Sequence, residues 1–312
     1  MKPRMLVVAA VVSLAASLSC QAGEGARTNI AQSIPTNVIF CARLDLNVAR
    51  TEEHAQRILD AAELQFKAQL DAIGSFSSLD LHDVDRIWVG IIKDKEALIV
   101  LEGRFDSERI LNSPVVTNSK RMVRPGTIVA IEMDDEKTGE LSHAVVIDDQ
   151  VIAFGLPHLV DRFVVNYTNG KSGWDKNGLA VMERLSATNA LLHVALMQIP
   201  VQEIRQKPFL ATVVNAQIEV SIPERVTATA RIAMQDEGKA TALKDLISGF
   251  IGLDLTSEIK MDDPDMKKAI LDGLKLGTEG KTVNLSSTMD TELLCKLLRT
   301  KGLQLNGCTA PH

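Results

Sequence analysis

The sequence predicts an α+β protein of two similar halves, each an antiparallel sheet with helices packed on one face. Three observations predict it: β-rich runs bounded by turn residues, helical periodicities between these runs, and an order of elements that repeats after about residue 170. The repeated order is strand, helix, strand, turn, strand, helix. That order is typical of split β-α-β, ferredoxin-like layers.

The first 20 residues predict an export signal of the bacterial type. Met1–Arg4 is a short basic segment, and Met5–Leu18 is an uncharged run of apolar and small residues. This run of about 14 residues is shorter than the roughly 20 that a bilayer-spanning helix needs. The small and polar residues that follow, 21–34, are expected to form a tether.

Two processing sites compete at the end of the signal. Cleavage after Ala22 would place small residues at positions −1 and −3. Alternatively, Ser17–Cys20 resembles an imperfect lipobox, in which Cys20 becomes a lipidated first residue. We favour lipid attachment at Cys20, which would anchor the chain to a membrane of the cell envelope.

The N-terminal half is expected to cover residues 35–170. An apolar run at 37–45 predicts a buried strand, and Thr51 begins an amphipathic helix that ends at Gly74. Asp85–Ile92 and Glu96–Phe105 predict a hairpin. The pattern then predicts a helix at Ser107–Asn112, strands at Thr127–Met133, Glu140–Ile147 and Val151–Phe154, and a helix at Leu156–Val165.

The Gly- and Asn-rich stretch Asn166–Gly178 predicts the boundary before a C-terminal half at residues 171–312. In the strand predicted at Arg225–Gln235, Thr227, Thr229, Arg231 and Ala233 alternate with apolar residues and share one face. The other predicted elements are strands Leu191–Met197, Val214–Ile222 and Thr282–Thr288, and helices Leu179–Ser186, Ile199–Lys207, Lys239–Ile251, Pro264–Leu274 and Asp290–Thr300.

The cysteines indicate one buried thiol and one candidate disulfide. Cys41 lies inside an apolar run and is expected in the core. In an exported protein, Cys295 and Cys308 could form a disulfide that fixes the tail to the last helix, although unpaired thiols are an equal alternative.

Three segments resemble uncharacterised exported bacterial α+β proteins, a domain-of-unknown-function family that includes lipoprotein-type members. They are an apolar strand after a proline that ends in Asp, Pro35–Asp45, the strand end Val100–Asp106, and the hairpin and helix of Ala144–Val165. The resemblance covers roughly residues 35–300. It implies an exported α+β protein and assigns no catalytic residue.

Motifs for common chemistries are missing or incomplete in the sequence. The six histidines have no metal-binding spacing, and His82-Asp83-Val84-Asp85 is more typical of a strand entry than of a metal site. Neither a complete phosphate-binding loop nor a GxSxG nucleophile motif occurs. We therefore expect no cofactor or metal, and the net charge of −6, which becomes −8 once a signal containing Lys2 and Arg4 is removed, disfavours nucleic acid as a partner.

The leading hypothesis is an exported, non-enzymatic binding or scaffolding protein of the periplasm or outer membrane, with an envelope protein as a partner. The alternatives are a hydrolase whose site is assembled from distant residues and a small-ligand carrier with its site between the halves, near Asn166–Gly178. Trp174 in that stretch is the candidate binding residue. The alternative is that its ring folds back and covers the seam between the halves.

Overall fold

The computed structural model describes residues 30–52, 55–56, 81–92, 96–134, 141–222, 224–252 and 271–294. The helix predicted from Thr51 to Gly74 and the helix predicted at Pro264–Leu274 therefore fall largely outside the described residues. The described strands are β1 (Phe40–Asp45), β2 (Val84–Ile91), β3 (Ala97–Gly103), β4 (Lys120–Met122), β5 (Val129–Asp134), β6 (Leu141–Val146), β7 (Val151–Gly155), β8 (Leu192–Leu196), β9 (Val213–Ser221), β10 (Val226–Met234), β11 (Leu274–Glu279) and β12 (Thr282–Met289).

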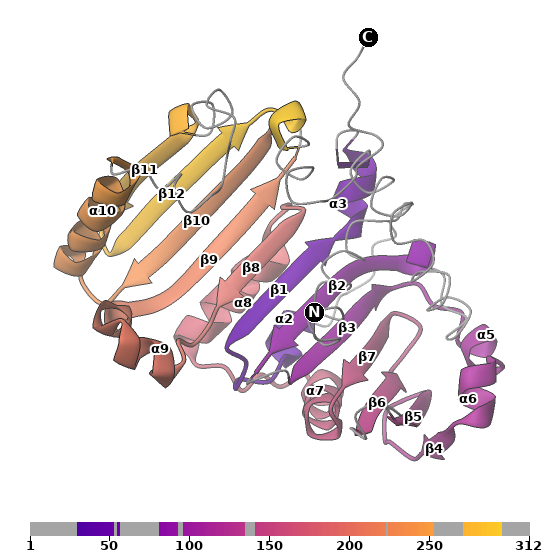
Figure 1. Ribbon diagram of the computed structural model, residues 1–312. Coiled ribbons are helices and arrows are strands. Elements are labelled where there is room, and N and C mark those ends of the chain that lie inside the picture. Colours follow the sequence, from indigo (N-terminus) through magenta and orange to yellow (C-terminus); the bar gives the residue numbers. More distant parts are fainter. Residues whose placement is uncertain are drawn as a thin grey trace, which may run out of the picture.

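All of these strands belong to one open, 12-stranded sheet, which twists across the molecule (Figure 1). Its order is β11-β12-β10-β9-β8-β1-β2-β3-β7-β6-β5-β4, and every neighbouring pair is antiparallel. The mixed α+β class and the antiparallel sheet are thus confirmed. The sheet runs without a break from the N-terminal strands to the C-terminal ones through the β1–β8 ladder.

The split β-α-β order is wrong at its first step. Such a unit separates its two parallel strands by a third strand, whereas β1 pairs directly with β2 in antiparallel fashion. Arg86 on β2 supplies a physical reason. Its guanidinium donates hydrogen bonds to Asp45 on β1 (2.7 Å) and to Glu102 on β3 (2.8 Å), which stabilises β2 between these two strands.

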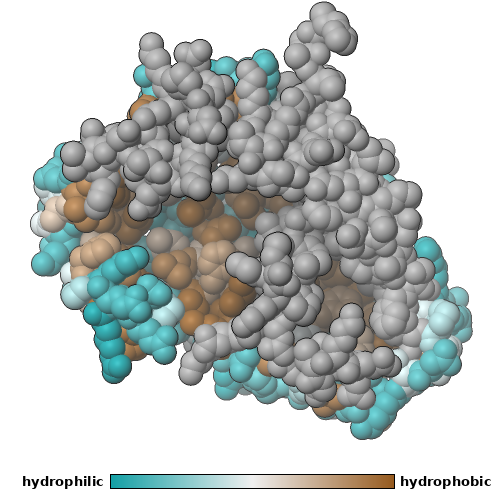
Figure 2. Space-filling view, in the orientation of Figure 1, coloured by the Kyte–Doolittle hydropathy of each residue, from teal (hydrophilic) through white to brown (hydrophobic). Residues whose placement is uncertain are grey.

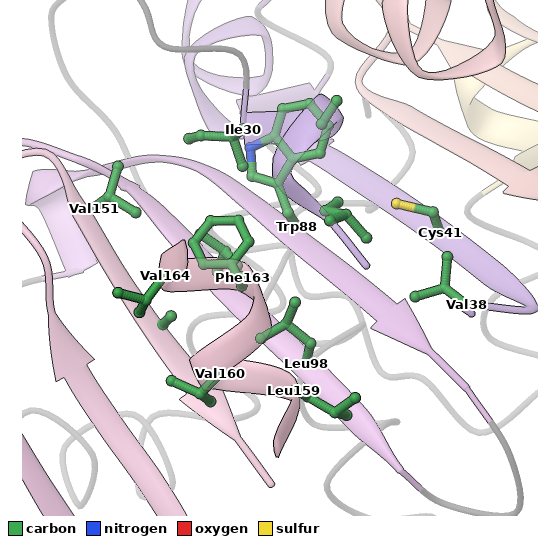
Figure 3. Packing of buried hydrophobic residues seen from close by; sticks show 14 of the residues in the cluster. Ile30, Val38, Cys41, Trp88, Leu98, Val151, Leu159, Val160, Phe163 and Val164 are labelled. Carbon is green, nitrogen blue, oxygen red and sulfur yellow. The ribbon is translucent and has the colours of Figure 1, made fainter. Parts of the chain in front are cut away.

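One face of the sheet, here called the helix face, carries Cys41, Leu98 and Val145. It packs against α2, α7 and α8 in one hydrophobic cluster. Figure 3 shows α7 lying over the strands, with Phe163 fully buried among them. The described helices are α2 (Ile30–Ser33), α3 (Leu46–Thr51), α5 (Ser107–Leu111), α6 (Pro114–Asn118), α7 (Pro157–Asn169), α8 (Lys176–Ala187), α9 (Val201–Gln206) and α10 (Glu237–Gly252), with short 3-10 turns η1 (Leu81–Asp83) and η2 (Pro208–Thr212).

The opposite face carries Leu44, Leu101 and Ile152, and helices pack here too. Ile110 of α5 and Val116 of α6 are buried in its cluster. The prediction of helices on one face is therefore wrong. In β3, β6 and β7, apolar residues occur at both odd-numbered and even-numbered positions. Each of these strands therefore buries both of its faces, and both faces of the sheet need helices to cover them.

In the C-terminal strands the two faces differ in polarity. On the opposite face, α10 packs through Ala240 against Met234 and Val283. Figure 2 shows hydrophobic residues gathered on this part of the molecule. Ile218, which the ladder registers place on the opposite face, is 45% exposed. On the helix face, the same strands present polar residues, in the alternation that the sequence predicted for β10.

The helix α7 continues to Asn169, beyond the predicted end at Val165, and Gly170 in a left-handed conformation (φ 61°) ends it. Strand β4 was not predicted, because its exposed Lys120 and Arg121 give no apolar pattern. Within the described residues, no helix combines the length and the apolar character needed to cross a bilayer.

Candidate functional site

Of the residues proposed from the sequence, Trp174 is the one that the structure describes. Cys20, Cys295 and Cys308 lie outside the described residues. The Trp174 ring is half-buried against the hydrophobic cluster of the helix face. Its Nε1 donates a hydrogen bond to the carbonyl of Ile34 (3.0 Å), so the loop before α8 is joined to the N-terminal half.

The sequence around Trp174 explains this placement. Asp175 is the N-cap of α8, and its carboxylate accepts a hydrogen bond from the backbone N–H of Gly178 (2.7 Å). A Cβ at Gly178 would lie 2.6 Å from Cε3 of the indole, so only glycine lets the ring rest on the first turn. Trp174, Asp175 and Gly178 line a hollow of about 440 Å³. Thr36, Asn177 and Gln198 also line it.

A second hollow, of about 790 Å³, adjoins the first along α8. The two share Asn177, Val181, Val214 and Asn215, and together we call them the polar groove. Its wall is α8, and its floor is the helix face of β9, β10 and β12. The polar residues that line the second hollow are Asn177, Arg184, Asn215, Gln217, Arg231, Glu279, Lys281, Thr282 and Asn284.

The ladder registers place the floor residues in rows. Arg231 lies directly between Gln217 and Asn284, its partners on the two neighbouring strands. In the next row, Ala233 lies between Asn215 and Thr282. Since opposed side chains on a sheet are about 5 Å apart, the small Ala233 leaves room beside the guanidinium of Arg231.

The larger hollow is locally basic on an acidic protein. Arg184, Arg231 and Lys281 line it, against one carboxylate, that of Glu279. Arg184 also lies 3.5 Å from the carboxylate of Glu219 at the edge of the floor. The chain as a whole has a formal net charge of −6, so the groove is a local positive region suited to an anionic ligand.

A row of buried polar residues crosses the sheet beneath α8. Arg43 on β1 is 1% exposed and donates hydrogen bonds to the carbonyls of Ser186 (2.8 Å), Thr188 and Ala190 (3.2 Å) at the end of α8. Its guanidinium also lies 5.9 Å from the centre of the Trp88 ring. Burial lowers the pKa of Arg43, and the nearby Asp45 opposes this shift.

His193 on β8 continues this row toward the groove. Its Nε2 lies 3.3 Å from Oε1 of Gln217 and 3.7 Å from Oε1 of Glu219. Burial lowers the pKa of His193 to about 4, against the opposing effect of Glu219. The imidazole is fully buried, so it supports the floor of the groove and does not contact a ligand in it.

Other chemically capable groups lie apart from the groove. Cys41 is buried as predicted, and burial raises the pKa of its thiol to about 12. Asp85, from the His-carboxylate cluster of the sequence, faces Arg50 at 3.7 Å. Among the residues that the structure describes, no three His, Cys, Asp or Glu side chains are grouped as metal ligands would be.

The sequence located one end of the groove and missed its floor. Trp174 stands out in the sequence as a tryptophan in a polar loop, whereas Arg231 has the pattern of any outward residue on an alternating strand. The order of β9, β10 and β12 brings Gln217, Arg231 and Asn284 together over 67 residues of sequence. No known protein family, curated protein or solved structure matches this chain.

Proposed function

We propose that this chain is an exported, non-enzymatic binding protein of a bacterial cell envelope that takes a small ligand in the polar groove. The observation that supports it best is the pair of adjoining hollows, about 440 and 790 Å³, at the Trp174 loop. Small-molecule sites are concave and typically enclose about 300–1,000 Å³. Among the hypotheses from the sequence, the geometry thus favours the small-ligand carrier over the protein scaffold.

The identity of the titratable groups near the groove also supports binding over hydrolysis. His193, the histidine nearest to the floor, is fully buried. The carboxylate beside it, Glu219, is engaged with Arg184 at 3.5 Å. A general base must reach the proton that it abstracts, and neither group is arranged to do so. Glu279, the carboxylate that lines the larger hollow, has no histidine and no second carboxylate beside it among the residues of that lining.

We further infer that the two halves are related by internal duplication. The order β1-β2-β3-β7-β6 of the first half corresponds, strand for strand, to β8-β9-β10-β12-β11 of the second. In both halves the helices after the third strand, α5 and α6 or α10, pack on the opposite face. In this scheme β4 and β5 are additions to the first half.

The correspondence gives the groove a structural origin. In the first half, α7 packs over the helix face of β3 and β7, where Leu98 and Val151 are buried. The corresponding strands of the second half, β10 and β12, carry Arg231 and Asn284 on that face. The polar groove lies on this face of the second half, with α8 as its wall.

The test of ligand binding uses a variant that fills the hollow. Ala180 on α8 is exposed and lines the larger hollow, so Ala180→Trp should block it with little effect on folding. Ala187→Trp, also exposed on α8 but outside the lining, is the matched control. The full chain and both variants are incubated with the low-molecular-mass fraction of a bacterial envelope and measured by native mass spectrometry.

We expect a bound small molecule on the wild type and on Ala187→Trp, and its loss from Ala180→Trp. A wild-type chain that retains nothing, or equal retention by Ala180→Trp, would contradict the proposal. Capture of the same envelope protein by all three chains, without a small molecule, would favour the scaffold hypothesis instead.

The envelope location has its own test at Cys20. We expect globomycin, which inhibits lipoprotein signal peptidase, to cause the precursor to accumulate, because processing would require a lipidated Cys20. A precursor that is processed normally under globomycin would show that cleavage follows Ala22 instead. The location outside the cytoplasm would then be retained, and the membrane anchor would be wrong.

A further inference from the structure

Arg231 differs from the other arginines on the described strands. Arg43, Arg86 and Arg121 each donate a hydrogen bond to a carbonyl or carboxylate oxygen. The side chain of Arg231 makes no hydrogen bond or ion pair with any described residue, although it is half-buried in the middle of β10. Its guanidinium lines the groove without a counter-charge among the described residues, so it can bind an anionic partner that arrives from solution.

The groups around Arg231 are neutral and can both donate and accept hydrogen bonds. Gln217 and Asn284 are its direct cross-strand neighbours, and Asn215 lies in the next row beside Ala233. Glu219, at the edge of the floor, is one row away and faces Arg184. Glu279, the carboxylate that lines the larger hollow, lies on β11 in the row of Ala233. Amide side chains match hydroxyl groups of a ligand, since each amide supplies donors and an acceptor.

Resting on the proposed function, we propose that the polar groove binds an acidic saccharide, that is, a hydroxyl-rich small molecule with a carboxylate. Arg231 binds the carboxylate, because a guanidinium offers two parallel N–H donors to a planar anion. Lys281 and Arg184 add positive charge at the rim. Asn215 and Asn284 bind the hydroxyl groups, and the larger hollow of about 790 Å³ suits a disaccharide. Gln217 is 8% exposed and supports the floor, since its Oε1 lies 3.3 Å from Nε2 of His193 and its Nε2 donates a hydrogen bond to Oδ1 of Asn215 (3.5 Å).

The experiment is isothermal titration calorimetry of the full chain with three probes: digalacturonate, the neutral disaccharide lactose, and inorganic sulfate. We expect digalacturonate to bind at least about tenfold more tightly than either of the others, since a charge-assisted hydrogen bond is worth roughly one factor of ten or more. Arg231→Gln should weaken digalacturonate binding by about the same factor. Arg205→Gln, which changes the same charge at an exposed site on α9 outside the groove, should leave it unchanged.

Each other outcome overturns this inference in a defined way. Equal binding of digalacturonate and lactose, unaffected by Arg231→Gln, would make the carboxylate irrelevant and leave the proposed function intact. Sulfate that binds as tightly as digalacturonate would mean a plain anion site without recognition of hydroxyls. If no probe binds, the ligand class is wrong, and the native mass spectrometry of Ala180→Trp decides the proposed function separately. Matching thermal unfolding of the Arg231→Gln and Arg205→Gln variants excludes misfolding as a cause.

Discussion

Arg43 and His193 lie directly opposite each other in the β1–β8 ladder, which joins the N-terminal strands to the C-terminal strands. Both side chains are fully or almost fully buried on the helix face, beneath the end of α8. One is a permanent cation that binds three carbonyl oxygens, and the other is an imidazole kept neutral at ordinary pH by burial. The junction of the sheet is thus stabilised by an arginine whose charge also opposes protonation of its neighbour.

The Arg43→Met variant should lower the free energy of unfolding by about 3 kcal/mol, because it removes the donors from three carbonyls at the end of α8 and removes one of the two cations beside Asp45. Urea denaturation measures this loss. Arg205→Met on exposed α9 is the control and should change stability by less than about 0.5 kcal/mol. Equal stability of the two variants would contradict the structural importance of Arg43.

His193 should make stability depend on pH between about 6.5 and 4. Its pKa is lowered in the folded state, so the unfolded chain binds the proton first as the pH falls. The contribution of neutral His193 to the free energy of unfolding is at its full value above pH 6.5 and is lost as the pH falls toward 4. The loss should reach about 2 kcal/mol by pH 4.5.

The measurement compares the free energy of unfolding of the wild type and of His193→Gln at pH 7 and pH 4.5. Other groups titrate in both proteins, so the difference between the two pH slopes isolates the imidazole. The glutamine variant should show the shallower slope. Identical slopes would mean that His193 titrates normally in the fold.

Gly178→Ala should displace the Trp174 ring from the first turn of α8. The added methyl would lie 2.6 Å from Cε3 of the indole, too close for both groups to stay in place. We expect a red shift of tryptophan emission and a loss of about 1–2 kcal/mol of stability. Gly249→Ala, in α10 where a Cβ meets nothing within 4 Å, should instead stabilise the chain by about 0.5–1 kcal/mol. Unchanged emission from Gly178→Ala would contradict the placement of Trp174.

Cys41 should not react with iodoacetamide in the native protein at pH 8, because burial raises the pKa of its thiol to about 12 and little thiolate forms. Intact-mass measurement counts the modified cysteines. The wild type and Cys41→Ala should give the same count before denaturation and differ by one after it. A difference of one in the native proteins would show that Cys41 is accessible.

Local features of the fold could be predicted from the sequence, and long-range ones could not. The hairpin of β2 and β3 and the alternating strand β10 follow from the period of two and from short polar turns. The pairing of β1 with β8 joins residues about 150 positions apart, and no local pattern encodes it. The same limit applies to the groove, because Arg231 and its amide neighbours are ordinary outward residues until the strand order brings them together.

The helices on both faces were missed for a related reason. A short apolar run is compatible with burial on one or two sides, and the length of a run does not reveal which helix will cover it. In β3, apolar residues occupy both odd-numbered and even-numbered positions. This pattern is the feature of the sequence that indicates a sheet covered on both faces.

The β1–β8 ladder also has a consequence for synthesis of the chain. Strand β1 ends at Asp45, and β8, its neighbour on the side away from β2, ends at Leu196. At ordinary rates of translation, roughly 10–30 s separate the appearance of the two strands, and during that time β1 has an unpaired edge. An apolar strand with a free edge is a template for pairing with other chains. The newly made N-terminal half is therefore the form most exposed to aggregation, and a chaperone that binds it before β8 is made should raise the yield of folded protein.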